Sequence, residues 1–524
     1  MKRILLMIMA VIMSMTLGAC SLADISGFTP ATAEPDSGQG DTARDTAETP
    51  ISYEITAGIT DLDTYNPLTT ASVTMQSICG FVFEPLFELD SQLYHMNVLA
   101  QEYSVSPDGR MLTVTLRPDV LWHDGTQFTA ADVVYTVNYI KRGGTRYDGY
   151  MDAVSGAQAL SNNVFAAYFS RPVPDPARLF TFPIIKNGSA NYAEYTPVGT
   201  GPFFFDASGN LIANEVYYGG RAILNRINIR ILPDNEKFLS LFDASAIDLA
   251  TSDMLNMSSY MPKSNANVWD FISNELVFIG FNERRAVFAE PAARRAVSYL
   301  IDRDEIVSKV YFTRAAAVYY AVNPSSWMTF DTNKKHIADA TGAREQLAGG
   351  GWTLNSSGVY TRVQNNRLIS FNVRLLVNSD SPERVRLVEL TAEAMKNAGM
   401  LVTIEKCPSE QFAARITAGN YDLFIGETNL KTNSDVSAIA ATGSNSFGYS
   451  SADVDAKLAQ LSVVTLNDDV KLVTRELHEI LFNDAPYAPI CFLKKSLVTS
   501  ARLTYGIDPS ISGYVRATRL WCNK

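Results

Sequence analysis

Two aspartates, Asp124 and Asp132, lie close enough in the sequence to suggest acid–base chemistry. A pair of carboxylates can act as general acid and general base on one substrate. Each residue also fits a structural position. Asp124 precedes Gly125 in a turn pair, and Asp132 follows Thr129 by three residues, which is the spacing of a helix capping box. We therefore expect a turn aspartate and a capping aspartate rather than a catalytic pair.

The other reactive residues form no known catalytic, nucleotide or metal pattern. Gly199 and Gly201 are spaced as in a phosphate loop, but no Lys-Ser or Lys-Thr pair follows them. No GxSxG or HExxH run occurs, and the four histidines are scattered without metal-ligand spacing. We predict a protein that is not an enzyme, with no catalytic residue, no cofactor and no metal site.

Five cysteines occur, and no two of them form a CxxC pair. The first, Cys20, ends an apolar run that begins after Lys2 and Arg3 and reads Leu-Gly-Ala-Cys at its end. The other four could form one or two disulfides outside the cell or remain buried thiols, and they are Cys79, Cys407, Cys491 and Cys522.

The N-terminal run is shorter than the roughly 20 apolar residues of a spanning helix and has the layout of a secretory signal. Its ending resembles a bacterial lipobox, which implies a lipoprotein signal peptide over 1–19 and a lipid on Cys20. The protein would then lie on the outer face of the cytoplasmic membrane, on the periplasmic side if there are two membranes. The alternative is an ordinary signal peptide with a coincidental cysteine, and hence a freely secreted protein.

Residues 20–50 are rich in Asp, Thr, Ala, Gly and Pro and lack apolar periodicity, so we predict a flexible linker. About 30 flexible residues span on the order of 30 Å. The rest of the chain has a composition that permits two or three lobes with their own cores. A net charge of -11 argues against nucleic acid as a partner.

Hydrophobic spacing predicts the main elements. Tyr103 to Leu116 reads as a hairpin around Asp108-Gly109, and a helix is expected from Thr129 onward. From Leu368 the order becomes strand, helix, strand, helix, strand, with one helix running from Ser381 to Asn397 and closed by Gly399. This alternation favours a parallel sheet covered by helices.

Several segments carry recognisable motifs. Trp122 to Val133 reads WHDGTQFTAADV, and Phe83 to Leu86 reads FEPL. Further segments of this kind are Asp61 to Pro67, Ser106 to Arg117, Val198 to Pro202, Phe281 to Arg303, Gly399 and Tyr421 to Leu423. Together they resemble the bacterial extracellular solute-binding proteins of family 5, which serve oligopeptide, dipeptide and nickel ABC importers. The first segment resembles the family run hDGtpfTAeDV, and the second resembles the family's yEgL helix, although Pro85 replaces its glycine.

The resemblance implies an α/β fold of the two-lobed periplasmic-binding-protein type (type II, cluster C), with an extra inserted lobe and a ligand cleft between the lobes. By this comparison lobe I comprises residues 51–93, 184–281 and 494–524. The inserted small lobe comprises residues 94–183, and lobe II comprises residues 282–493.

The resemblance also implies where the ligand binds. Cleft residues are expected in the loop after the first strand, at the start of the yEgL helix, in the loop after Tyr421 to Leu423, and beyond the helix that begins at Pro291. The expected ligand-binding residues are Tyr65, Asn66, Met75, Gln76, Asn323, Trp327, Glu427, Thr428, Asn429, Lys431 and Asp435.

The loop after Tyr421 to Leu423 departs from the pattern of peptide-binding relatives, because the usual tryptophan is absent and Lys431 stands near the expected acid. If Lys431 faces the cleft, it favours a carboxylate or phosphate on the ligand. If it faces solvent, Glu427 or Asp435 could bind the ammonium group of a peptide.

The leading hypothesis is a membrane-tethered, monomeric binding protein that captures a peptide or similar small solute and delivers it to the transmembrane subunits of an ABC permease. A peptide-signal receptor that uses the same cleft is the alternative. An extracellular hydrolase is a third reading, which the missing catalytic motifs disfavour.

Overall fold

The structure is a computed structural model that describes residues 54–173, 175–190, 197–232, 240–252, 266–431, 433–464, 466–503 and 507. The expected signal peptide, the linker, Cys20 and Cys522 lie outside these residues. The main element is a mixed sheet with the strand order β18-β17-β19-β12-β20-β11-β1-β10-β9-β8, and β13 pairs with β20 beside it.

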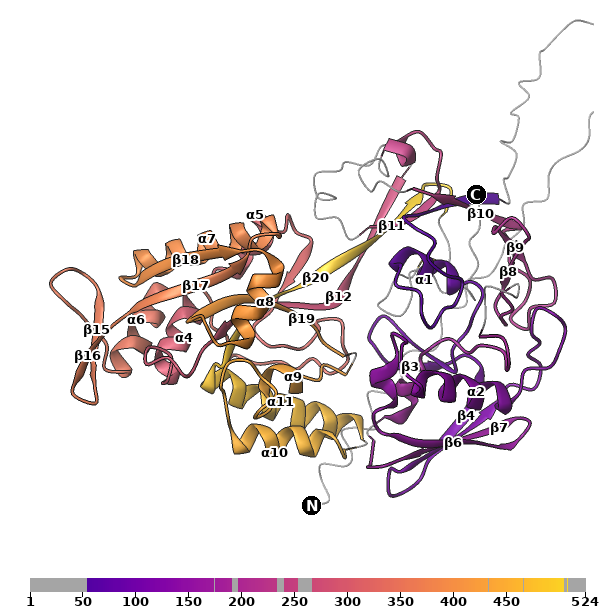
Figure 1. Cartoon of the computed structure of the whole chain (residues 1–524), viewed down its shortest axis with the longest axis horizontal. Helices are drawn as coiled ribbons and strands as arrows, with labels where there is room; N and C mark the ends of the chain where they lie inside the picture. The colour runs from indigo at the N-terminus through magenta and orange to yellow at the C-terminus, as the bar shows by residue number, and fades with distance from the viewer. Residues whose placement is uncertain are drawn as a thin grey trace, which may run out of the picture. The chain divides into compact units, whose positions relative to one another are not determined.

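Two long antiparallel strands run through the middle of this sheet (Figure 1). They are β12, Ala266–Phe281, and β20, Tyr487–Ser500, and their pairing extends from Ala266 opposite Ser500 to Gly280 opposite Tyr487. The strands on one side of this pair are β1 Glu54–Ile59, β8 Phe203–Phe205, β9 Leu211–Ala213, β10 Arg226–Ile231 and β11 Leu249–Ser252. We call the elements from β1 to β11 the N-terminal lobe and those from α4 to α11 the C-terminal lobe; β12 and β20 belong to both.

The C-terminal lobe confirms the predicted strand and helix alternation. β17 pairs in parallel with both β18 and β19, as expected for strands joined by helical crossovers. The elements in chain order are β17 Asn372–Asn378, α7 Pro382–Asn397, β18 Leu401–Cys407, α8 Ser409–Thr417 and β19 Leu423–Asn429. The Ser381 side chain caps α7 by accepting a hydrogen bond from Arg384 N, and Gly399 follows the helix with φ of 93°.

The predicted hairpin and capped helix of the N-terminal lobe are also confirmed. β4, Ala100–Val105, pairs with β5, Met111–Leu116, in a sheet with the order β4-β5-β7-β6. The other two strands are β6 Val154–Ser161 and β7 Val164–Phe169, and the helix beside them is α2 Ala130–Lys141. Asp132 accepts from Thr129 N at 2.8 Å and from Asn187 N at 2.9 Å, so it is a structural carboxylate.

Shorter elements complete the two lobes. In the N-terminal lobe they are α1 Val73–Cys79, β2 Phe87–Leu89, β3 His95–Asn97, and the 3-10 helices η1 Asp148–Met151 and η2 Pro176–Phe180. In the C-terminal lobe they are α4 Pro291–Tyr299, α5 Arg303–Lys309, β13 Ala315–Ala317, α6 Ala340–Gly349, β14 Thr353–Leu354, β15 Tyr360–Gln364, β16 Arg367–Ser370, α9 Ser437–Ala440, α10 Ala452–Leu461 and α11 Asn467–Asp484.

Each lobe has its own hydrophobic core. One cluster runs from Ile55 on β1 through Val114 on β5 to Val137 on α2. Two further clusters, around Leu375 and Phe424, fill the C-terminal lobe. The four-stranded sheet falls inside residues 94–183, and its core is continuous with that of β1, while the exact lobe boundaries stay a prediction.

One family-like segment differs from its predicted conformation, and a second shows why its glycine is needed. Phe83 to Leu86, expected as a helix, lies after α1 outside any helix, and Pro85 forms an isolated β-bridge with Pro183. Proline has no backbone N–H to donate within a helix, which fits this conformation. At Gly199 an added Cβ would lie 1.8 Å from Val82 O, so this glycine permits close backbone packing.

Candidate functional site

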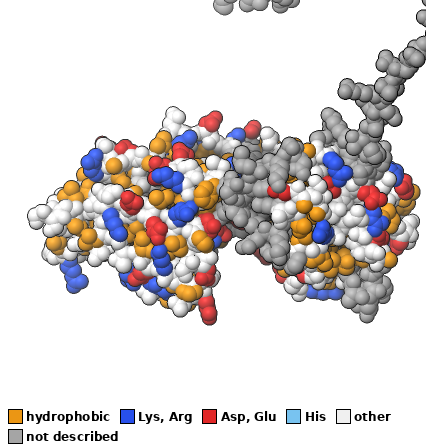
Figure 2. All heavy atoms as spheres, turned by 90° about the horizontal axis from the view of Figure 1, so that it is seen from above, with side chains coloured by type: hydrophobic (Ala, Val, Ile, Leu, Met, Phe, Trp, Pro, Cys, Tyr) orange, Lys and Arg blue, Asp and Glu red, His pale blue; other side chains and the backbone are white. Residues whose placement is uncertain are grey.

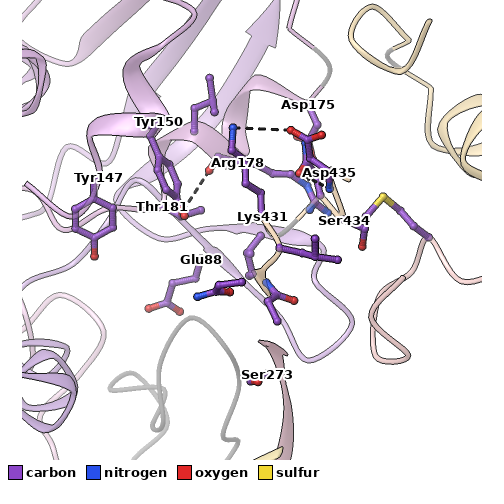
Figure 3. A pocket seen from close by; sticks show the side chains of 18 of the residues that line it. Glu88, Tyr147, Tyr150, Asp175, Arg178, Thr181, Ser273, Lys431, Ser434 and Asp435 are labelled. Atoms are coloured by element: carbon purple, nitrogen blue, oxygen red, sulfur yellow. Dashed lines mark hydrogen bonds and ion pairs between the residues drawn. The ribbon is translucent and has the colours of Figure 1, made fainter. Parts of the chain in front are cut away.

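A cavity of about 1080 Å³ lies between the two lobes and is lined by residues of both. Figure 3 shows Tyr147 and Tyr150 of the N-terminal lobe in this cavity together with Lys431 and Asp435 of the C-terminal lobe. Its size is close to the upper end of the roughly 300–1,000 Å³ that small-molecule sites occupy. The cavity can therefore hold a ligand larger than a single amino acid.

The floor of the cavity is an irregularity in the pairing of the two long strands. The register shifts between Ile272 and Leu276 of β12, and Ser273, Asn274 and Glu275 line the cavity there. Extra residues in one strand bend it locally and leave backbone groups without ladder partners. This bulge lies where β12 passes from one lobe to the other.

A buried asparagine holds the floor in place. Asn323 is 1% exposed, and its Nδ2 donates to Ser273 O at 3.0 Å and to Asn274 Oδ1 at 2.8 Å. Leu430 N donates to Asn274 O at 2.9 Å, which connects the end of β19 to the same bulge. The side chain of Asn323 therefore satisfies polar groups that the irregular ladder leaves unpaired.

A second contact between the lobes involves Trp327, and we call Gln92, Tyr94, Asp175, Arg178 and Trp327 the bridging cluster. Trp327 N donates to Gln92 O at 2.9 Å, and its ring stacks on Tyr94 with centroids 5.3 Å apart. The Arg178 guanidinium lies 5.7 Å from the Trp327 ring, within the range of a cation–π contact.

Asp175 anchors the N-terminal part of the bridging cluster. Its carboxylate pairs with Arg178 Nε at 2.5 Å and with His95 Nδ1 at 2.9 Å (Figure 3 shows the first of these pairs). Burial alone would raise the pKa of Asp175, but the hydrogen bonds and charges of His95 and Arg178 lower it below its ordinary value. The residue also has φ of 43°, a left-handed conformation that Asp tolerates better than most residues.

The α10 and α11 helices supply a largely apolar wall. Leu458, Leu461, Val470 and Leu477 line the cavity there. His478 lies beside them with 2% of its surface exposed, and burial lowers its pKa to about 4. This wall therefore carries no charge at neutral pH from the histidine.

The loop after β19 forms the polar side of the C-terminal lobe. Lys431 and Asp435 line the cavity with Nζ and Oδ2 3.8 Å apart, and the lysine side chain is 64% exposed. Asp435 also accepts a hydrogen bond from Ser437 N at 2.9 Å. Lys431 therefore lines the cavity with a side chain that is mostly exposed, and which ligand group it favours stays a prediction.

The structure brings some of the predicted binding residues to this cavity and places the others elsewhere. The residues that line it are Gln76, Trp327, Asn429, Lys431 and Asp435. The predicted residues that lie outside its lining are Tyr65, Asn66, Met75, Asn323, Glu427 and Thr428.

Most of the second group have structural contacts of their own. Met75 is fully buried in the core, and Asn66 accepts from Leu68 N while donating to Tyr139 OH. Tyr65 packs its ring edge-on against Phe205. Glu427 pairs with Arg384 at the start of α7. A role of any of the predicted residues in ligand binding stays a prediction.

Sequence reasoning missed the wall formed by residues 146–153 with Arg171, and the wall formed by α10 and α11. Gly143-Gly144, directly after the helix of residues 130–141, was a visible loop signal for the first wall. No sequence signal marked the second, because its leucines have the spacing of an ordinary core face.

Four further observations concern surface charge, metal ligands, membrane spans and cysteines. Figure 2 shows Lys and Arg interspersed with Asp and Glu on the described surface that it presents. Within the described ranges, no group of three or more His, Cys, Asp or Glu could hold a metal ion. None of the helices described is long and apolar enough to span a membrane. Cys79, Cys407 and Cys491 are buried free thiols.

Comparison with known proteins gives the family. The family model described as "Bacterial extracellular solute-binding proteins, family 5 Middle" matches residues 96–450. The oligopeptide-binding protein AppA of Bacillus subtilis (strain 168) is 21% identical over 463 residues, which cover 81% of this chain and 83% of AppA. The glutathione-binding protein GsiB of Escherichia coli (strain K12) is 24% identical over 482 residues, which cover 86% of this chain and 90% of GsiB.

Solved structures show the same fold. HbpA2 from Haemophilus parasuis superimposes with a TM-score of 0.80 at 16% identity, over 90% of this chain and 100% of HbpA2. The mixed sheet and the two lobes thus form a periplasmic-binding-protein fold. Because the family model covers more than half of the sequence, the chain belongs to the bacterial extracellular solute-binding proteins of family 5.

Proposed function

We propose that this protein is the substrate-binding component of an ABC importer, which captures a peptide or a similar small solute and delivers it to the permease. The observation that carries the proposal is the cavity between two lobes that share the strands β12 and β20. A ligand that contacts both lobes shifts the equilibrium between open and closed arrangements toward the closed one. Such capture requires no catalytic group.

The relatives and the cavity together support a peptide as the solute. AppA is named as an oligopeptide-binding protein and GsiB as a glutathione-binding protein, and both ligands have a peptide backbone. The cavity offers polar groups for such a backbone at Gln76, Asn429 and Asp435 beside the apolar wall of α10 and α11. We propose that these residues contact the solute together with Trp327 and Lys431.

Equilibrium binding of defined di- to pentapeptide libraries tests this function. Intrinsic fluorescence is a suitable readout because Trp327 lines the cavity. We expect a saturable change, and mass spectrometry of the purified protein should find a small solute that copurifies with it. The absence of a saturable response to all of these libraries would contradict peptide capture.

We further propose that the protein acts as a monomer tethered through a lipid on Cys20 at the outer face of the cytoplasmic membrane, on the periplasmic side if there are two membranes. Two acyl chains anchor a protein stably, since each buried CH₂ adds about 0.8 kcal/mol. A tether raises the effective concentration of the binding protein near its permease.

Replacing Cys20 with Ala tests the tether separately from ligand capture. We expect Cys20→Ala protein to leave the membrane fraction and to bind peptides with unchanged affinity. Retention of the variant at the membrane would contradict lipid anchoring, and a loss of affinity would contradict a purely tethering role.

A further inference from the structure

The cavity has one wall in the N-terminal lobe that is formed by the segment 146–153 and by Arg171. Its backbone is held in place on both sides. Asp148 accepts hydrogen bonds from Gly144 N and Thr145 N, each at 2.9 Å, just before the η1 helix. Ser170 N donates to Ala153 O at 2.9 Å, which places Arg171 directly beside the end of this segment. The side chains of this wall therefore start from fixed positions at the cavity.

The charges that line the cavity are not all matched. Three of the lining cations have ion pairs: Lys495 with Glu275 at 2.9 Å, Arg178 with Asp175 at 2.5 Å, and Lys431 with Asp435 at 3.8 Å. The remaining lining cations are Arg146 and Arg171.

Arg146 and Arg171 differ from the other three cations in their partners. Both are exposed, and neither has an ion pair with any residue that the structure describes. Asp152 is a carboxylate on the same wall that also lacks such a pair in the described part of the chain. Among the described residues, this wall thus presents two guanidinium groups and one carboxylate without an ion pair.

Guanidinium groups are suited to bind a carboxylate. The planar fork of arginine donates two parallel hydrogen bonds to the two oxygens of such a group. The Arg146 guanidinium lies 5.2 Å from the centroid of the Tyr147 ring, a contact that orients it without neutralising its charge. A concave site with low-dielectric walls strengthens the attraction between such a cation and an anion.

We infer that Arg146 and Arg171 form the subsite for a carboxylate of the captured solute, so that this protein selects peptides with a free C-terminal carboxylate. The inference rests on the proposed function and names the part of the solute that the N-terminal lobe recognises. The largely apolar wall of α10 and α11 then accommodates uncharged side chains of the same solute.

Two matched peptide libraries test the inference, one with free C-termini and one with the same sequences amidated. Binding is measured at low ionic strength on Cys20→Ala protein and on Arg146→Gln, Arg171→Gln and the double variant made in it. Arg142→Gln is the matched control, because Arg142 is an exposed arginine at the end of α2 that does not line the cavity. Thermal unfolding checks that each variant is folded.

We expect amidation to weaken binding to the parent protein by at least about tenfold, which is the loss expected for a hydrogen bond to a charged group. Arg146→Gln and Arg171→Gln should each reduce this preference, the double variant should abolish it, and Arg142→Gln should keep it. Equal binding of both libraries by the parent protein overturns the inference and leaves peptide capture intact. Binding of neither library contradicts the proposed function itself, and the inference with it.

Discussion

At the floor of the cavity the two lobes share continuous strands, whereas at the bridging cluster they meet through side chains and one backbone hydrogen bond from separate loops. The floor is part of the long ladder between β12 and β20. Asn323 of the C-terminal lobe donates hydrogen bonds to Ser273 O and Asn274 Oδ1 at the bulge in this ladder. The bridging cluster consists of the Trp327 N–H to Gln92 O bond, the stack on Tyr94 and the Arg178 contact. The shared strands at the floor keep the lobes covalently connected. The contacts of the bridging cluster, in contrast, can break without unfolding either lobe.

The free energies of these contacts support the distinction between the floor and the bridging cluster. A net hydrogen bond, an aromatic pair and a cation–π contact each contribute about 0.5–1.5 kcal/mol. The bridging cluster therefore holds the lobes together by a few kcal/mol at most, and a ligand that binds the closed arrangement more tightly than the open one can add a contribution of similar size. A ligand cannot undo the floor without unfolding the protein.

The largest effect is expected for Asn323→Ala. The substitution leaves the oxygen atoms of Ser273 and Asn274 without their partner in a buried site, so the free energy of unfolding should fall by about 2–3 kcal/mol. Chemical denaturation measures this, with Asn372→Ala as a control at an exposed asparagine that begins β17. Equal stability of the two variants would contradict the role given to Asn323.

The next effect is expected for Asp175→Asn, which keeps a residue that tolerates the left-handed backbone and removes one charge. Because the folded-state pKa of Asp175 is lowered, its carboxylate stabilises the fold at pH values above the ordinary aspartate pKa. We expect a loss of about 1–2 kcal/mol at pH 7, between the value of an exposed ion pair and that of a fully buried one, because the Asp175 side chain is 21% exposed. The loss should vanish as the pH falls below the ordinary pKa, toward the lower folded-state value. If the loss of stability is the same at pH 7 and at the lowest pH at which the protein stays folded, the negative charge of Asp175 is not its cause.

A smaller effect is expected from a double-mutant cycle of Trp327→Ala and Tyr94→Ala. The two substitutions should couple by about 1 kcal/mol in stability, because each removes the same ring stack. Small-angle scattering of Trp327→Ala should show a larger radius of gyration than the parent protein. Strictly additive effects would mean that the stack does not hold the lobes together.

The smallest effect is expected for Lys431→Ala. Its partner is 3.8 Å away and its side chain is mostly exposed, so the change in unfolding free energy should stay below about 0.5 kcal/mol. A measured loss above 1 kcal/mol would show that the loop after β19 depends on this pair. The exposed pair would then matter for stability as the buried contacts of Asn323 do.

Regular patterns made much of the fold predictable. Thr129 and Asp132 marked the start of α2, Ser381 and Gly399 marked both ends of α7, and the alternation that follows predicted the parallel strands of the C-terminal lobe. These features depend on residues that are near one another in sequence.

The site was less predictable because it depends on residues that are distant in sequence. Trp327 meets Tyr94 and Arg178 only after both lobes have folded. The role of Asn323 depends on a bulge in β12, and no periodicity of that strand indicated it. The non-helical backbone around Pro85 was not predicted, because the family pattern suggested a helix there. Proline in place of the family's glycine disfavours that helix.

The proposed function requires that the solute binds in the cavity between the lobes. Its most direct test uses Cys20→Ala protein and tripeptides that carry a photoreactive benzoyl-phenylalanine, with mass spectrometry to locate the cross-links. We expect cross-links in residues 146–153, at Trp327 or Met328, and between Asn429 and Ser437, and competition by unlabelled peptide should remove them. Competable cross-links confined to other surfaces, such as residues 416–419 beside Arg285, would contradict it.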